Sequence, residues 1–124
     1  MKKALITGAN KGIGLATAKL LLQKGYYVYL GSRNILNGTT AIEKLKTENL
    51  TNVEHIQLDV TDDNSVNTAF EEIANKTDVL DILINNAGIN GGKEPYSVLE
   101  AKPEEFQAAF DVNVIGTSRV NKAF

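Results

Sequence analysis

Short apolar runs alternate along this chain with longer stretches in which apolar residues recur every three or four positions. A short apolar run is typical of a β-strand, and the longer recurrence is typical of one face of a helix. The runs predict four strands, at Lys3–Thr7, Tyr27–Leu30, Val53–Leu58 and Val79–Ile84. The stretches between them predict helices that begin after the first strand, at Thr39 or Thr40, at Asp63 and near Pro103. This alternation predicts an α/β fold, a doubly wound parallel sheet with helices on both faces.

The same periodicity assigns residues to helix faces. The first helix repeats its apolar residues at Ile13, Ala16 and Leu20 and is expected to end at Lys24-Gly25. The inward residues of the next two helices are expected to be Ala41, Ile42 and Leu45, and then Val66, Ala69, Phe70 and Ile73. The last helix carries a stripe formed by Phe106, Phe110, Asn113, Thr117, Val120 and Phe124. The fourth strand is almost continuously apolar, which predicts a central strand buried on both faces.

The composition restricts the class of protein. At 124 residues, 43% of them hydrophobic, the chain can form one domain with its own core and has no room for a second. The net charge is −2, and no basic cluster alternates with aromatic residues, so nucleic acid and membranes are not expected partners. Cysteine is absent, which excludes disulfides and thiol chemistry. The apolar run after Met1-Lys2-Lys3 is too short for a signal peptide, so we expect a cytoplasmic protein that binds a small molecule.

The glycine-rich stretch Thr7–Gly14 joins the first strand to the first helix. Glycine in such a loop permits a sharp turn, lets backbone N–H groups approach a ligand and lets the helix pack closely on the strand. The free N–H groups at the helix N-terminus favour a phosphate or diphosphate group. The spacing Gly-x-x-x-Gly-x-Gly differs from the general dinucleotide pattern Gly-x-Gly-x-x-Gly, and an ordinary glycine-rich turn is the alternative interpretation.

Two further polar features fall at informative places in the pattern. The segment Asn85-Asn86-Ala87-Gly88 follows the fourth strand, at the carboxyl edge of the sheet where ligands bind in open α/β folds. Asn113 lies on the apolar stripe of the last helix. A buried amide costs about 1–3 kcal/mol unless it is hydrogen-bonded, so the pattern predicts a partner for Asn113, in a site or on a neighbouring backbone.

Taken in order, the motifs Thr7–Gly14, Asp59-Val60, Asn85–Gly88 and Asn113 resemble those of the short-chain dehydrogenase/reductase family, in its carbonyl-reductase-like branch. This family uses the glycine spacing found here, and the resemblance extends over all 124 residues. It implies a Rossmann fold and a nicotinamide-dependent oxidoreductase that acts on a small-molecule carbonyl/alcohol pair. The cofactor-binding residues expected from these motifs and from the end of the second strand are Gly8, Asn10, Lys11, Gly12, Ile13, Gly14, Arg33, Asp59, Val60, Asn86, Ala87 and Gly88.

The resemblance also implies roles for several of these residues. Asp59 and Val60 correspond to the pair that contacts adenine, and Asn85–Gly88 to the segment that steadies the sheet and lines the cofactor. Asn113 corresponds to the asparagine that helps to hold a proton-relay water near the catalytic lysine, so it is the catalytic-site residue expected in this sequence. For Asp59, a carboxylate that caps the next helix is an alternative or additional role.

The end of the second strand bears on the choice of cofactor. NAD-binding members of such folds place an acidic residue there to hydrogen-bond the ribose 2′-hydroxyl. The stretch Ser32-Arg33-Asn34 has no carboxylate. The planar cation of Arg33 suits a 2′-phosphate, and Lys11 adds a second positive charge. We therefore predict NADP(H) rather than NAD(H), with two ordinary solvated cations as the alternative.

The sequence departs from the family at the catalytic centre. The family requires a serine, and a tyrosine followed four positions later by a lysine that lowers the pKa of the phenol. None of the four tyrosines has a lysine at that distance. We therefore expect residues 1–124 to form an NAD(P)-binding Rossmann domain that is incomplete, with the catalytic half absent, and that is inactive alone. A stand-alone nucleotide-binding or protein-interaction module without catalysis, or a scaffold that binds nothing, is the alternative.

An incomplete sheet would leave the strand Val79–Ile84 with one edge bare. Unpaired N–H and C=O groups on an apolar strand are a template for pairing with another chain, and Asp81 is the only charged residue of this strand. We therefore expect the chain to self-associate through that edge, or to fold poorly.

Overall fold

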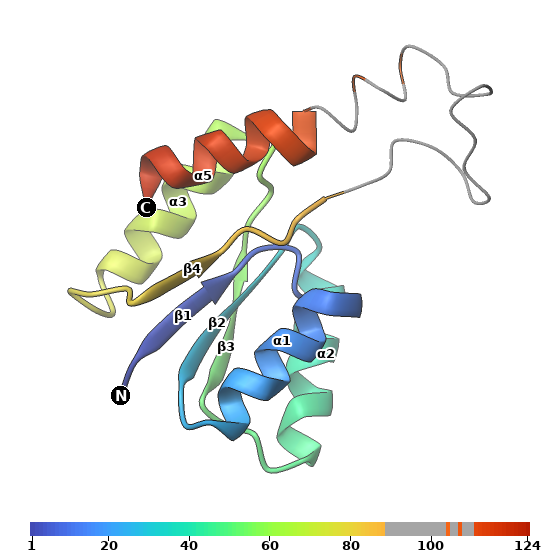
Figure 1. The fold of residues 1–124 in the computed structure, drawn as a ribbon, viewed down its shortest axis with the longest axis vertical. Coiled ribbons are helices and arrows are strands. Elements are labelled where there is room, and N and C mark those ends of the chain that lie inside the picture. Colours follow the sequence, from blue (N-terminus) through green and yellow to red (C-terminus); the bar gives the residue numbers. More distant parts are fainter. Residues whose placement is uncertain (89–103, 105–106, 108–110) are drawn as a thin grey trace.

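The computed structural model describes residues 1–88, 104, 107 and 111–124. Four parallel strands form one sheet in the order β3-β2-β1-β4 (Figure 1). Their bounds are β1 Lys3–Ile6, β2 Tyr27–Ser32, β3 Val53–Gln57 and β4 Ile82–Ile84. The helices are α1 Gly12–Gln23, α2 Ile35–Thr47, α3 Asp63–Ala74 and α5 Thr117–Ala123, the last preceded by a π-helical segment, η2, at Asp111–Gly116. The predicted alternation of strands and helices is confirmed.

The sheet has a hydrophobic core on each face. Alternate residues of a strand point to opposite faces, so Leu5 of β1 contributes to one core and Ile6 to the other. Helices α1 and α2 cover the face of Ile6, while α3 and α5 cover the face of Leu5 (Figure 1). Parallel strands covered by helices on both faces make this a Rossmann-type, doubly wound sheet, as the sequence predicted. No helix among the described residues is both long and apolar enough to cross a bilayer.

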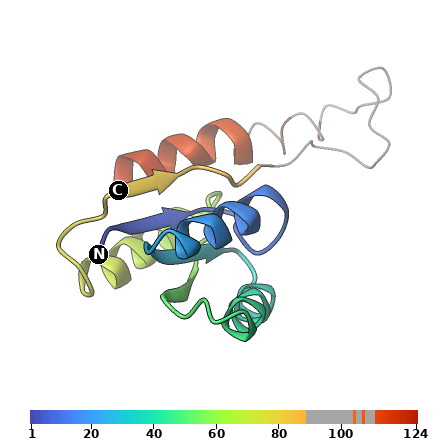
Figure 2. The ribbon, with the colours of Figure 1, turned by 60° about the horizontal axis from the view of Figure 1, so that its bottom comes forward.

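Strand β4 differs from the prediction. Of the predicted Val79–Ile84, only Ile82–Ile84 pair as a strand, and these three residues are half-buried rather than buried on both faces. The side chain of Val79 is 60% exposed. Within the described residues β4 pairs only with β1, which leaves its other edge without a neighbouring strand and places it at the border of the sheet (Figure 2). The apolar sequence of a central strand is therefore found here at an edge.

Helix α1 forms and ends as predicted, but with a different face inward. Gly14, Ala18 and Leu22 are buried, whereas Ile13 and Leu20 are 80% and 52% exposed. The helix has apolar residues around most of its circumference, so periodicity alone did not select the face. The two small residues of the buried face let the helix backbone approach the sheet closely.

Helix α2 begins earlier than predicted. The Asn34 side chain caps it by accepting a hydrogen bond from the Asn37 N–H at 2.9 Å. Thr39 and Thr40 lie inside the helix, and the Thr39 hydroxyl donates to the Ile35 carbonyl instead of capping a terminus. Two asparagines and a glycine made the first turn resemble a loop in the sequence. The predicted inward residues, Ala41, Ile42 and Leu45, are buried.

Helix α3 matches the prediction closely. Its Val66, Ala69 and Ile73 are buried, and Asp62 caps its N-terminus. Phe70 was also predicted to face inward, and this is wrong: it is 43% exposed, and its ring packs edge-on against that of Phe124, with centroids 5.5 Å apart. This contact joins α3 to the end of α5.

The last helical region corrects the predicted stripe. Asn113 and Val114 are exposed, whereas Gly116 and Val120 are buried. A π-helical turn accommodates an extra residue, so the 3.6-residue repeat is out of phase across Asp111–Gly116. The predicted start near Pro103 and the stripe residues Phe106 and Phe110 lie outside the described residues.

Candidate functional site

The loop between β1 and α1 lies at the carboxyl edge of the sheet. Gly8 and Gly12 have φ angles of +60° and +61°, a conformation that favours glycine. A Cβ on Gly8 would lie 2.8 Å from the Cα of Ala87, so this position also needs glycine for space. The Ala9 N–H donates to the Gly31 carbonyl at 2.8 Å, which fastens the loop to the end of β2.

The Thr7 hydroxyl joins this loop to the segment after β4. The buried oxygen accepts hydrogen bonds from the N–H groups of Asn86, at 3.0 Å, and Ala87, at 2.9 Å. In return, the Asn86 side-chain amide donates to the Gly8 carbonyl at 3.0 Å. Two motifs about eighty residues apart in the sequence thus form one unit. No role was predicted for Thr7, although a hydroxyl at the end of an apolar strand was a usable signal.

The N-terminus of α1 is open at this edge. Lys11 occupies the cap position, its side chain makes no capping hydrogen bond, and no acidic residue lies in the first turn. In the described part of the chain, the first N–H groups of the helix therefore have no capping side chain. Gly14 packs against the side-chain amide of Asn86, so a larger residue there would displace the second motif. The exposed Ile13 side chain lies in the same turn.

A cavity of about 570 Å³ lies beside this terminus, between α1 and α2. Among the residues that the structure describes, its lining includes Lys11 and Lys44 and no acidic side chain; these lining residues are Asn10, Lys11, Gly12, Leu15, Asn37, Thr40, Ala41 and Lys44. Arg33 is exposed at the end of β2 and does not belong to this lining. Of the two cations predicted to bind the cofactor, Lys11 therefore lines the cavity and Arg33 lies at the strand end.

The turn Asp59-Val60 follows β3. Asp59 Oδ1 accepts hydrogen bonds from the Thr61 N–H at 2.9 Å and from the Thr61 hydroxyl at 2.6 Å. The alternative role for Asp59 as the cap of α3 is wrong, because Asp62 makes that capping bond, with the Asn64 N–H at 2.9 Å. Val60 is buried against the last helical region, where a Cβ on Gly116 would lie 2.6 Å from its Cγ2.

Asn113 lies beside the second motif. A Cβ on Gly88 would lie 2.9 Å from its side-chain Oδ1, so the π-helical segment brings this amide to the Asn-Asn-Ala-Gly loop. The same loop is tied to α5 by a hydrogen bond from the Asn85 amide to Asn121 Oδ1, at 2.8 Å. The structure therefore groups Gly8–Gly14, Asn86–Gly88 and Asn113, while Asp59-Val60 and Arg33 end the neighbouring strands.

One titratable group lies under the start of α2. His55 Nε2 is 2.7 Å from Ser32 Oγ, and that hydroxyl donates to the Asn34 carbonyl at 2.9 Å. Burial lowers the pKa of His55 below its ordinary value, and an interaction with the Ser32 backbone opposes that shift. The neutral ring thus supports the backbone on both sides of Arg33.

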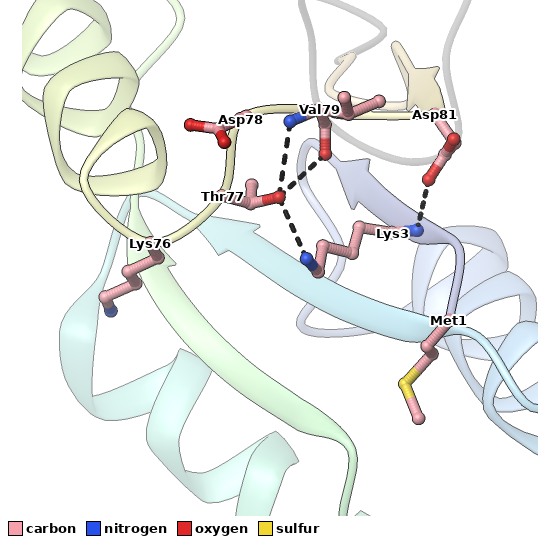
Figure 3. Close-up of a pocket in the computed structure, with 7 residues that line it drawn as sticks. All are labelled: Met1, Lys3, Lys76, Thr77, Asp78, Val79 and Asp81. Carbon is pink, nitrogen blue, oxygen red and sulfur yellow. Dashed lines mark hydrogen bonds between the residues drawn. The ribbon is translucent and has the colours of Figure 1, made fainter.

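A second cavity, of about 530 Å³, lies at the opposite edge of the sheet, where β1 begins (Figure 3). Lys3 makes two hydrogen bonds across it: its Nζ donates to Thr77 Oγ1 at 2.9 Å, and its N–H donates to Asp81 Oδ2 at 2.8 Å. These bonds fasten the connection from α3 to β4, which is a structural role.

Comparisons with known proteins agree with this arrangement. The family model described as short chain dehydrogenase matches residues 2–124. The short-chain dehydrogenase anuI of Penicillium roqueforti is 35% identical over 97% of this chain and 47% of its own length. The structure of ElxO with NADP bound superposes with a TM-score of 0.85 at 35% identity, covering 98% of this chain and 48% of that one.

A third match differs in its cofactor. The 3-ketoacyl-(acyl-carrier-protein) reductase of Brucella melitensis, complexed with NADH, has a TM-score of 0.83 at 30% identity, covering 98% of this chain and 47% of its own. The chain thus spans about half the length of each of these three proteins.

Proposed function

Because this chain belongs to the short-chain dehydrogenase family, we propose that it is the cofactor-binding part of an NADP-dependent oxidoreductase acting on a carbonyl/alcohol pair. The observation that carries the proposal is the joining of the two loops through Thr7 beside the open N-terminus of α1. A diphosphate suits that terminus, because backbone N–H groups and the helix dipole both favour an anion.

The remaining site residues have corresponding proposed roles. Gly8, Asn10, Gly12, Ile13 and Gly14 surround the diphosphate and the adjoining ribose. Asp59 and Val60 contact the adenine, and the loop Asn86–Gly88 lines the cofactor. The bound nicotinamide would supply the hydride.

The preference for NADP rests on charge at the end of β2. Arg33 is exposed there, no carboxylate accompanies it, and Lys11 lines a cavity without acidic side chains. A guanidinium can bind a phosphate through two parallel hydrogen bonds, whereas an NAD site needs an acceptor for the ribose hydroxyl. Of two solved structures that resemble this chain to a similar degree, one contains NADP and the other NADH. The preference is therefore inferred from these residues and not from the family.

We do not propose that this chain transfers the proton that carbonyl reduction requires. No Tyr-x-x-x-Lys pair occurs in this sequence, so the polypeptide 1–124 is expected to bind cofactor without reducing a carbonyl. Asn113, beside Gly88, is proposed to hold a water at the edge of the site. The absence of a Tyr-x-x-x-Lys pair from this sequence also supports the second candidate, a nucleotide-binding module without catalysis.

Calorimetric titration of the chain with NADPH and with NADH tests the proposal. We expect NADPH to bind at least about tenfold more tightly, and Arg33→Ala to remove that preference by weakening NADPH binding about 10- to 100-fold, the effect of losing a charge-assisted hydrogen bond. Lys46→Ala, which removes an exposed cation from the far end of α2, is the matched control and should change neither affinity. Equal affinities that Arg33→Ala leaves unchanged would rule out the NADP assignment.

A further inference from the structure

Arg119 of α5 reaches the turn that follows β3. Its Nη1 donates a hydrogen bond to the Val60 carbonyl at 2.6 Å, and its Nε forms an ion pair with the Asp63 carboxylate. The Arg119 side chain is 22% exposed, whereas that of Asp63 is 78% exposed. Surface ion pairs contribute about 0–1 kcal/mol, so the bond to the buried backbone is the more important contact.

Gly116, three residues before Arg119, reinforces that contact. A Cβ at Gly116 would lie 2.6 Å from Val60 Cγ2 and 3.1 Å from the Val60 carbonyl oxygen. The helix backbone therefore packs directly on Val60, while the guanidinium holds its carbonyl. The last helical region fixes this residue through its side chain and its peptide group.

The preceding residue is fixed from the other side. The Asp59 N–H donates to Ser65 Oγ at 2.8 Å, and that hydroxyl donates to Gln57 Oε1 at 2.9 Å. Thr61 occupies Asp59 Oδ1 with two hydrogen bonds, which leaves Oδ2 as the oxygen able to accept from a ligand. The Val60 carbonyl and the Thr61 N–H belong to one peptide group, so the carbonyl that Arg119 holds also fixes the N–H that bonds Asp59 Oδ1. The direction of the other oxygen, Oδ2, depends on that bond.

We propose that Arg119 is a positioning residue for the base-binding part of the cofactor site. It does not touch the cofactor; it holds the Val60–Thr61 peptide so that the Asp59 carboxylate, which accepts from the Thr61 N–H, keeps the direction needed to accept a hydrogen bond from the exocyclic amine of adenine. This inference rests on the proposed cofactor-binding function. It assigns to α5 the selection of the purine base.

Binding of two cofactors that differ in that amine tests the inference. The probes are NADP⁺ and its hypoxanthine analogue, which carries a carbonyl oxygen where adenine has the amine. The wild-type chain should bind NADP⁺ about tenfold more tightly than the analogue, the value of one hydrogen bond. Arg119→Met should lower the affinity for NADP⁺ about tenfold and leave that for the analogue within about twofold, so that the preference disappears.

Two control variants separate positioning from general stability. Lys122→Met removes an exposed cation from the same helix and should change neither affinity. Asp63→Asn removes the ion pair but keeps the bond to Val60, so the preference for adenine should remain. If Arg119→Met does not fold, Arg119→Lys is the substitute. Its single ammonium replaces a guanidinium that bonds two acceptors, so the preference for NADP⁺ over the analogue should be reduced.

The possible failures are distinguishable. An equal loss of affinity for both probes in Arg119→Met would show a merely structural role and overturn the inference. A wild-type chain that binds both probes equally would overturn it as well, and would leave the proposed function standing. A wild-type chain that binds neither probe would overturn both.

Discussion

Gly38 lies in the interior of α2, where glycine destabilises a helix by about 1 kcal/mol relative to alanine. The structure gives the reason for glycine here. A Cβ would collide with the His55 ring and would lie 2.5 Å from Ser32 Oγ. The absence of a side chain lets His55 reach Ser32, whose hydroxyl bonds the carbonyl of the Asn34 cap.

Gly38→Ala should therefore lower the free energy of unfolding by about 1–3 kcal/mol, the usual cost of overpacking, in spite of the better helix propensity of alanine. Urea denaturation of the chain measures this change. In a His55→Ala background the clash with the ring is absent and only the close approach to Ser32 Oγ remains, so the same substitution should cost clearly less than in the wild-type chain. An equal loss in both backgrounds would contradict the role given to the ring.

Single residues were predictable from the sequence where a motif determines the backbone. The glycines of Thr7–Gly14 have the turn and the close approaches expected of them. The connecting role of Thr7 was not predictable, because its partners lie about eighty residues away. The exposure of Asn113 was missed because a helical repeat assumes 3.6 residues per turn, and the segment that contains it is π-helical.

Strand β4 presents one edge without a partner among the described residues. It is apolar and half-buried, and Ile82 is its one residue outside both hydrophobic clusters. Natural edge strands usually carry charges or bulges that prevent pairing with other chains. We expect the polypeptide 1–124 to associate through this edge.

Size-exclusion chromatography with light scattering tests this expectation. The polypeptide 1–124 should form dimers or larger species at tens of micromolar, and Ile82→Lys should reduce association because a charge on an edge opposes strand pairing. Leu20→Lys, which replaces an exposed apolar residue of α1, is the control and should leave association unchanged. A cooperatively melting wild-type monomer, or an effect of the α1 variant alone, would show that the β4 edge is not the interface.

The elements themselves were predictable to different degrees. Strands β1 to β3 were predictable because they are apolar runs whose residues enter the two hydrophobic cores, and helix α3 because one face of it is buried against the sheet. The start of α2 was missed because Gly38 makes its first turn resemble a loop. The inward face of α1 was missed because small residues, and not its large apolar ones, lie against the sheet.

The whole molecule assembles its site at one edge of the sheet. The carboxyl ends of the four strands carry the two joined loops, Arg33 and the turn Asp59-Val60 (Figure 1). At the opposite edge, Lys3 is hydrogen-bonded to Thr77 and Asp81 beside the second cavity (Figure 3). This grouping was predictable once the sheet was taken to be parallel, because parallel strands bring their carboxyl ends to the same edge. The order of the strands and the contribution of α5 required the structure.

The central claim is that NADP binds at this edge, and residue-specific amide NMR during titration of the chain with NADP⁺ tests it most directly. The account predicts shift changes confined to Gly8–Gly14, Arg33, Asp59-Val60 and Asn86–Gly88, with none at Thr77 and Asp81 on the opposite edge. Chemical-shift changes centred on the opposite edge would contradict it. So would the absence of any change at an NADP⁺ concentration that saturates members of the family.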